Sequence, residues 1–175
     1  MAYCVITNDK AIFDSSAGIA TITVSPTTIT GTGLFSINDN AVCIAGDENS
    51  ISATGTYITS VYTVPGTISA KVSLSSIQYS TILKSKILPV ILAIGKFNVT
   101  YSVNSPAKNS NNTDTTTSYS GTGYFQTFNT TVSTGNLAAS QTRLSFALVT
   151  NILTPIAVVS IGVDPLFGET IFGQY

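Results

Sequence analysis

The chain has 175 residues, of which 43% are hydrophobic and only 9% are charged, with a net charge of −1 at pH 7. This length suits a domain whose core needs no disulfide support. Only seven residues are Lys or Arg, and no four of them cluster, the nearest approach to a cluster being Lys84 and Lys86 with Lys96 beyond. This excludes the electrostatic footprint of nucleic-acid binding. The absence of histidine excludes Ser-His-Asp and Cys-His arrangements and histidine-based metal sites.

Apolar and polar residues alternate with a period of two along much of the chain, which predicts half-buried strands. Turn signals such as Asn38-Asp39-Asn40 and Pro65-Gly66 separate these stretches at short intervals. The fold class that we expect is mostly β, with many short antiparallel strands in a sandwich, a barrel or a spike-like domain. The strand candidates, in chain order, are residues 20–24, 34–37, 42–45, 57–64, 68–74, 90–94, 97–104, 123–128 and 144–149.

One short helix is expected from Ser75 to Lys86, with Ser75 or Ser76 as its cap. Residues 104–120 are polar and rich in Asn and Thr, which predicts a long loop with too little apolar content to bury.

The chain therefore forms a single β-domain over residues 1–175, or two related halves at about 1–104 and 119–175 joined by the loop 104–120. The second option depends on an echo between Gly-Thr-Gly-Leu-Phe at 31–35 and Gly-Thr-Gly-Tyr-Phe at 121–125.

Residues 144–163 carry no formal charge and are about long enough to span a bilayer. Asn151, Pro155 and the β-branched residues that follow instead favour two buried strands joined at 151–155. We therefore expect no membrane span. The first ten residues lack a basic stretch followed by a long apolar one, so no secretory signal peptide is visible.

Cys4 and Cys43 could form a disulfide in an oxidising compartment, although the apolar run around Cys43 favours a small buried thiol.

Asp47 and Glu48 would point to opposite faces of an extended chain, and the other acids are scattered singly, so no carboxylate pair for hydrolysis is recognised. Asn38-Asp39-Asn40 with Asp47 lacks the twelve-residue pattern of a calcium loop. We expect no catalytic residue, no metal and no cofactor.

Three stretches of the sequence resemble the PAAR-like spike-tip proteins of type VI secretion systems and contractile phage tails. One runs from a Ser-Pro pair through a turn to a Gly-Asp pair. Another is Leu88 to Leu92 followed by Phe97 to Ala107, and the third is the Gly-Thr-Gly echo. The residues of the first stretch that carry the resemblance are Ser25, Pro26, Gly31, Asn38, Gly46 and Asp47.

The resemblance implies a structural, non-enzymatic tip or plug that docks onto a trimeric spike or neighbouring subunits in an oligomeric assembly. Such tips are made in the cytoplasm without a signal peptide and then expelled, so the localisation expected is extracellular or virion-associated. The family's histidine-held metal site cannot be carried over, and Val42-Cys43 replaces its Ala-Arg pair. The alternatives are an adhesive or pilus-type subunit that assembles by strand donation and a viral capsid or tail β-sandwich.

Overall fold

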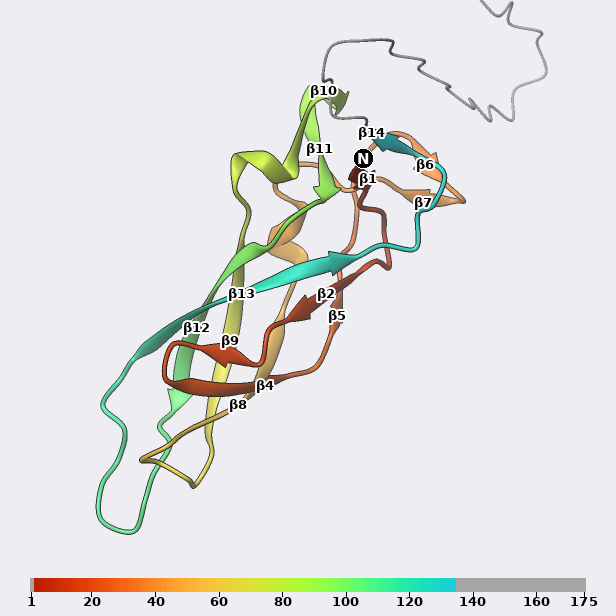
Figure 1. The fold of residues 1–175 in the computed structure, drawn as a ribbon. Helices are drawn as coiled ribbons and strands as arrows, with labels where there is room; N and C mark the ends of the chain where they lie inside the picture. The colour runs from red at the N-terminus through yellow and green to blue at the C-terminus, as the bar shows by residue number, and fades with distance from the viewer. Residues whose placement is uncertain (1, 135–175) are drawn as a thin grey trace, which may run out of the picture. The chain divides into compact units, whose positions relative to one another are not determined.

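The computed structural model describes residues 2–134 of the chain (Figure 1). The chain divides into two compact units, Met1–Ser140 and Gln141–Tyr175, and the described residues all belong to the first. The strands predicted between residues 144 and 163 lie outside the described residues. The mostly β fold class is confirmed, because the described residues form antiparallel strands with two short 3₁₀ turns.

Fourteen strands and two 3₁₀ turns make up the described part of the chain. In chain order they are β1 (Ala2–Cys4), β2 (Lys10–Phe13), β3 (Ser16–Ala17), β4 (Ala20–Val24), β5 (Thr27–Thr28), β6 (Ser36–Ile37), β7 (Asn40–Ala41), η1 (Asp47–Ser50), β8 (Ala53–Thr59), β9 (Gly66–Ser73), η2 (Ser76–Gln78), β10 (Tyr79–Ser85), β11 (Leu88–Ala93), β12 (Phe97–Ser105), β13 (Ser118–Gln126) and β14 (Ser133–Thr134).

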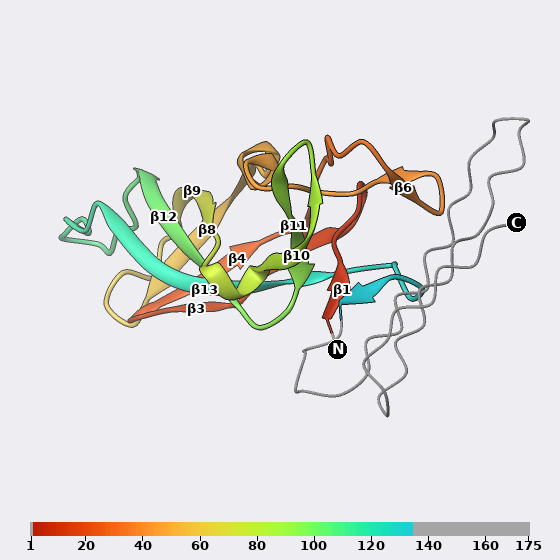
Figure 2. The same cartoon turned by 90° about the horizontal axis from the view of Figure 1, so that it is seen from above.

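The larger sheet has the strand order β3-β4-β8-β9-β12-β13-β2-β5. It curls into a half-barrel (Figure 2). One long hairpin joins its two ends, because β2 pairs with β5 and β3 pairs with β4 along a continuous stretch of chain. The hairpin turns at Gly18, whose φ of 61° is the left-handed value that tight two-residue turns need. The half-barrel is therefore tied across its open side by the chain's own N-terminal strands.

The long hairpin bends where its pairing register shifts by one residue. Lys10 pairs with Thr28 before the bend, whereas Ser16 pairs with Thr21 after it. Such a shift is a β-bulge, a place where a proline is tolerated because a ladder bond is already missing. Pro26 lies at this bend, between β4 and β5.

The interior of the half-barrel holds the main hydrophobic cluster. The alternation predicted at 97–104 is confirmed, since Phe97, Val99 and Tyr101 of β12 are all fully buried there. Phe97 packs against Phe125 of β13, with ring centroids 4.9 Å apart. Gly123 is needed beside them, because a Cβ at that position would lie 2.5 Å from the ring of Phe97. Because aromatic rings bury large apolar areas, Phe97 and Phe125 contribute strongly to this cluster.

A second hydrophobic cluster lies beneath the smaller sheet, whose strand order is β10-β11-β1-β14. Its buried members come from β1 and the residues just after it, from β6, from the segment after β7 and from β11, and they are Ala2, Cys4, Ile6, Ile37, Val42, Ile44, Val90 and Leu92. The side chains of Phe35, Leu83 and Val132 pack against it from the rim.

The polar connection between β12 and β13 is shorter and better anchored than the sequence indicates. β12 extends to Ser105 and β13 begins at Ser118, and Ala107 between them is fully buried. Lys108 exchanges two backbone hydrogen bonds with Val64 in the β8–β9 connection. The segment is therefore held by hydrogen bonds where it lacks apolar contacts.

The helix predicted from Ser75 to Lys86 is wrong beyond its first turn. Ser75 does cap a turn, and Gln78 completes a reciprocal capping box with it, but this turn is the 3₁₀ turn η2. The chain then becomes strand β10 at Tyr79. Pairing with β11 holds the two ends of β10, at Tyr79 and at Lys84–Ser85. The β-branched residues Thr81 and Ile82 between these ends favour a strand over a helix.

Candidate functional site

Three extended segments meet at a junction formed by Val5, Cys43 and Ile91. Cys43 N–H donates to Val5 O at 2.9 Å, Val5 N–H donates to Ile91 O at 2.9 Å, and Ile91 N–H donates to Cys43 O at 2.8 Å. Each residue thus donates to one neighbour and accepts from the other, so the three bonds close a ring. We call this arrangement the three-way junction. Its local symmetry approximates a threefold axis.

The residues that flank the junction pair in the same cyclic manner. Cys4 pairs with Leu92, Ile6 bridges to Val42, and Ile44 bridges to Val90. Because side chains alternate along extended chain, these six side chains lie in the second cluster, whereas the side chains of the three junction residues lie in the main cluster. The junction therefore forms the layer that separates the two hydrophobic clusters.

The two cysteines lie on opposite sides of this layer, and both are buried free thiols. Burial raises the pKa of Cys4 to about 11. Burial also raises the pKa of Cys43, and the nearby carboxylates of Asp47 and Asp9 raise it further. Neither thiol is in the thiolate form that reacts near neutral pH.

Asp47 of the predicted motif holds the segment that leads into the junction. Its carboxylate accepts hydrogen bonds from Ile44 N–H at 2.8 Å, from Thr32 N–H at 2.9 Å and from the Thr32 hydroxyl at 2.8 Å. Gly31 lies beside Thr32, and a Cβ at Gly31 would lie 2.6 Å from the carbonyl oxygen of Ala41. The Gly-Asp pair that ends the motif and the Gly-Thr-Gly segment at 31–33 are thus brought together by hydrogen bonds and close backbone packing.

The other predicted motif residues lie apart from the junction. Ser25 and Pro26 are exposed at the bend of the long hairpin, and Asn38 occupies the turn between β6 and β7 with φ 50°. Gly46 precedes Asp47 with φ 103°, a conformation that favours glycine. These positions shape turns and bends in the backbone.

Asp9 is a buried carboxylate that sequence reasoning missed. It accepts hydrogen bonds from Ile6 N–H and Phe128 N–H, both at 2.8 Å, and so ties the N-terminal strand to the end of β13. Burial raises its pKa, and hydrogen bonds from Thr127 and the two backbone groups oppose that rise. The turn formed by Asn8, at φ 73°, is the only local signal that marked this position.

Glu48 and Asp114 also serve structural contacts. Glu48 accepts a hydrogen bond from the Tyr79 hydroxyl at 3.0 Å, and burial together with this bond raises the pKa of Tyr79 to about 12. Asp114 accepts from the hydroxyls of Tyr57 and Tyr119 beneath the β12–β13 connection. No group of three or more metal-ligating side chains converges among residues 2–134.

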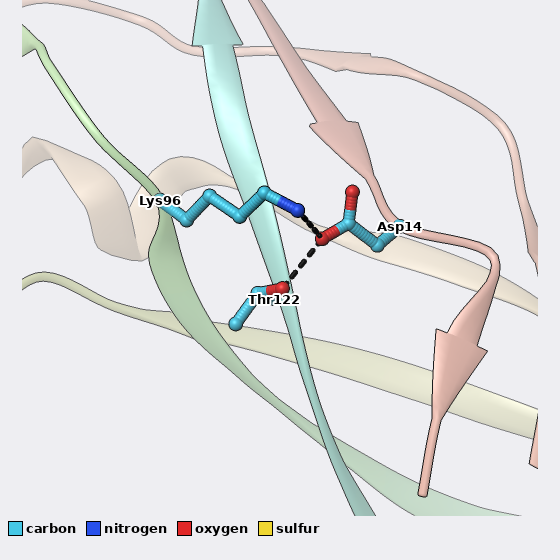
Figure 3. Close-up of polar contacts among 3 residues, drawn as sticks. All are labelled: Asp14, Lys96 and Thr122. Atoms are coloured by element: carbon cyan, nitrogen blue, oxygen red, sulfur yellow. Dashed lines mark hydrogen bonds and ion pairs between the residues drawn. The ribbon is translucent and has the colours of Figure 1, made fainter.

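A partly exposed ion pair marks the bend of the long hairpin. Figure 3 shows Asp14 accepting from Lys96 Nζ at 2.8 Å and from the Thr122 hydroxyl. The Lys96 and Thr122 hydrogen bonds lower the pKa of Asp14. The contact joins the hairpin to β13 and to the start of β12.

Ile87 and Leu88 at the tip of the β10–β11 hairpin are exposed apolar residues, and so is Leu34, which lies just before β6 and is hydrogen-bonded to the hairpin; we call these three residues the hairpin patch. Ile87 is 90% exposed and Leu34 is 77% exposed. Ser85 connects them, because it pairs with Leu88 across the hairpin and its hydroxyl accepts a hydrogen bond from Leu34 N–H at 2.7 Å. No motif in the sequence signalled this surface.

The fold and these contacts define a structural protein: an all-β unit whose polar side chains fix its backbone. A family model described as contractile injection system spike tip protein matches residues 1–135. The chain therefore belongs to this spike tip family, and it is a structural tip component of a contractile injection system. A comparison with curated proteins finds no match to the chain. The predicted resemblance to PAAR-like spike tips is confirmed.

Family membership also indicates what kind of partner the chain has and where it is located. A spike tip assembles with other proteins and is exported or virion-associated. None of the helices among residues 2–134 is long and apolar enough to cross a membrane. Nothing in the comparisons supports the pilus-type or capsid alternatives.

Proposed function

We propose that this chain is a non-enzymatic plug that docks, as a single copy, onto the end of a trimeric spike and is expelled with it after synthesis in the cytoplasm. The match to the spike tip family over residues 1–135 carries the proposal. A single chain that caps three identical subunits must offer them comparable contacts, and closed symmetry favours such matching.

The three-way junction supports the trimeric partner. Val5, Cys43 and Ile91 come from three separate segments and are related by one ring of hydrogen bonds. A monomer organised around such a local axis can present similar chain directions to each of three subunits. The junction lies between two buried clusters, so this arrangement is rigid.

The non-enzymatic role is supported by what the buried carboxylates do. Asp9, Asp47 and Asp114 each accept hydrogen bonds from backbone N–H groups, and Asp114 also accepts from tyrosine hydroxyls. Carboxylates committed in this way hold loops together and are not oriented toward a substrate. With seven scattered cations and a net charge of −1, we propose no nucleic-acid partner.

Light scattering on a mixture of this chain with the spike protein of the same injection system tests the proposal. We expect a complex whose mass corresponds to one tip chain per spike trimer. Failure to form any complex at tens of micromolar would overturn the docking function. Turnover of a substrate that disappears in the Asp47→Asn/Glu48→Gln double variant would overturn the non-enzymatic role.

A further inference from the structure

We propose that the hairpin patch, centred on Ile87, is the surface that inserts into the spike protein, in an apolar socket with an acidic rim. The inference rests on the proposed docking function and adds which residues make the contact. Leu34, Ile87 and Leu88 supply the apolar part, and Lys84 and Lys86 supply the charge.

Exposure distinguishes Ile87 from the other large apolar residues that the structure describes. Ile87 is the most exposed large apolar side chain among them. Leu34 is tied to the same hairpin, because its N–H donates a hydrogen bond to the hydroxyl of Ser85, which pairs with Leu88. Burying apolar area is the main source of free energy in protein association, and such contacts concentrate in a few anchor residues. A cluster that includes the most exposed apolar side chain therefore has the properties of an anchor.

The hairpin is rigid and continuous with the three-way junction. Ser85 is buried and Leu83 packs on the second cluster. Ile91 of the following strand belongs to the junction. Figure 1 shows the β10–β11 tip standing out from the sheets. A preorganised tip loses little conformational entropy on binding, and force applied to it would pass directly into the core.

The turn itself carries a residue that local energetics disfavour. Lys86 and Ile87 have φ values of 52° and 66°, the left-handed conformation, which is an outlier for a β-branched side chain. The β6–β7 hairpin uses a turn with the same pair of positive φ values, but with Asn38 and Asp39, which suit it. Strain that a fold retains at an exposed position points to a function for the residue that causes it.

Charge indicates the chemistry of the socket rim. Lys84 and Lys86 are both exposed on the hairpin, and neither has an ion-pair partner among the described residues. Two unpaired ammonium groups beside an apolar anchor match a partner surface on which carboxylates surround an apolar pocket. The spike end is the occupant that a spike tip must contact.

Affinity for the purified spike protein, measured with the full chain, tests the inference. We expect Ile87→Asp to weaken binding by about 30-fold or more, the loss typical of an anchor residue. The Lys84→Glu/Lys86→Glu double variant should also bind more weakly than the wild type, and its loss of affinity should be larger at low salt than at high salt. Val61→Asp is the matched control, because Val61 is also aliphatic and 60% exposed but lies in the β8–β9 connection. It should bind within about twofold of the wild type.

Ile87→Gly keeps the inference testable if a charged variant misfolds, because glycine relieves the turn and removes only the anchor. It should melt at a higher temperature than the wild type and still bind the spike at least about tenfold more weakly. If both Ile87 variants bind the spike as tightly as the wild type does, the inference is overturned but the docking function is not. Absence of binding by the wild type would overturn both.

Sedimentation with phosphatidylcholine and phosphatidylglycerol vesicles separates a protein socket from a lipid surface. We expect no sedimentation of the chain with these vesicles. Sedimentation that requires Ile87, together with spike binding that does not, would assign the hairpin patch to a membrane and overturn the inference.

Discussion

Cys4 and Cys43 belong to extended segments that meet at the three-way junction, yet their side chains lie in different hydrophobic clusters. The hydrogen-bond ring keeps the two segments in register, and alternation along each segment then directs the two thiols to opposite sides of the layer they share. A disulfide needs Cβ atoms about 3.5–4.5 Å apart with their bonds directed toward each other, so bridging them would require the junction to rearrange.

Thiol titration tests this arrangement. We expect two free thiols in the denatured protein, and negligible reaction in the native protein, because burial raises the pKa of both Cys4 and Cys43. Zero free thiols after denaturation without reductant would show that a bridge forms and that the junction differs from the structure described above.

Two buried tyrosines should respond in opposite ways to loss of their hydroxyl groups. The Tyr57 hydroxyl donates to Asp114 at 2.9 Å and accepts from Ala107 N–H at 3.0 Å, whereas the Tyr101 hydroxyl is buried without a partner among the described residues. Tyr57→Phe should lower the free energy of unfolding by about 1–3 kcal/mol, and Tyr101→Phe should leave it unchanged or raise it by up to about 1 kcal/mol.

Urea unfolding of the two tyrosine variants provides the measurement. Each substitution removes one oxygen atom from a buried ring, so each variant is the other's control. Equal losses in the two variants would contradict the hydrogen-bond assignment.

The ion pair between Asp14 and Lys96 should contribute modestly to stability and only above acidic pH. The folded-state pKa of Asp14 is lowered, first by the Lys96 hydrogen bond and then by that from Thr122. Its contribution is therefore present above the unfolded pKa of about 3.9 and is lost as the pH falls through the lower folded value. Since both side chains are partly exposed, Asp14→Asn should cost no more than about 1 kcal/mol at pH 7.

Denaturant unfolding of the wild type and of Asp14→Asn at neutral pH, and again below the folded pKa, checks the sign. The difference between the two proteins should shrink on acidification. A difference that grows instead would mean that the carboxylate destabilises the folded state.

Ile87→Gly should stabilise the isolated protein. Glycine adopts φ near 66° without the cost of about 1–2 kcal/mol that an L-residue with a Cβ incurs there, and its greater freedom in the unfolded chain offsets part of that gain. We expect a net increase of about 1 kcal/mol in the free energy of unfolding.

Asp39→Gly in the β6–β7 turn serves as the control for this measurement. Asp39 has φ 62°, and aspartate tolerates this conformation better than isoleucine. The gain should therefore be smaller than at Ile87. A larger gain at Asp39 would show that the β10–β11 turn is not under particular strain.

The sequence by itself determined the fold class and the strand at 97–104, because alternation with a period of two is a local property and its buried face is one continuous surface. It also placed Gly31 and Asp47 in one motif and pointed to the spike tip family. Local patterns did not decide between helix and strand at Tyr79 to Ser85, because that choice depends on pairing with β11.

The tertiary structure alone decided how distant segments meet. The ring of Val5, Cys43 and Ile91 joins residues nearly forty or more positions apart through backbone groups, and backbone hydrogen bonds leave no mark in side-chain patterns. Whether Cys4 and Cys43 face each other depends on that register, and the exposure of Ile87 depends on where the hairpin ends. These are properties of packing between elements, so they appear only once the chain is folded.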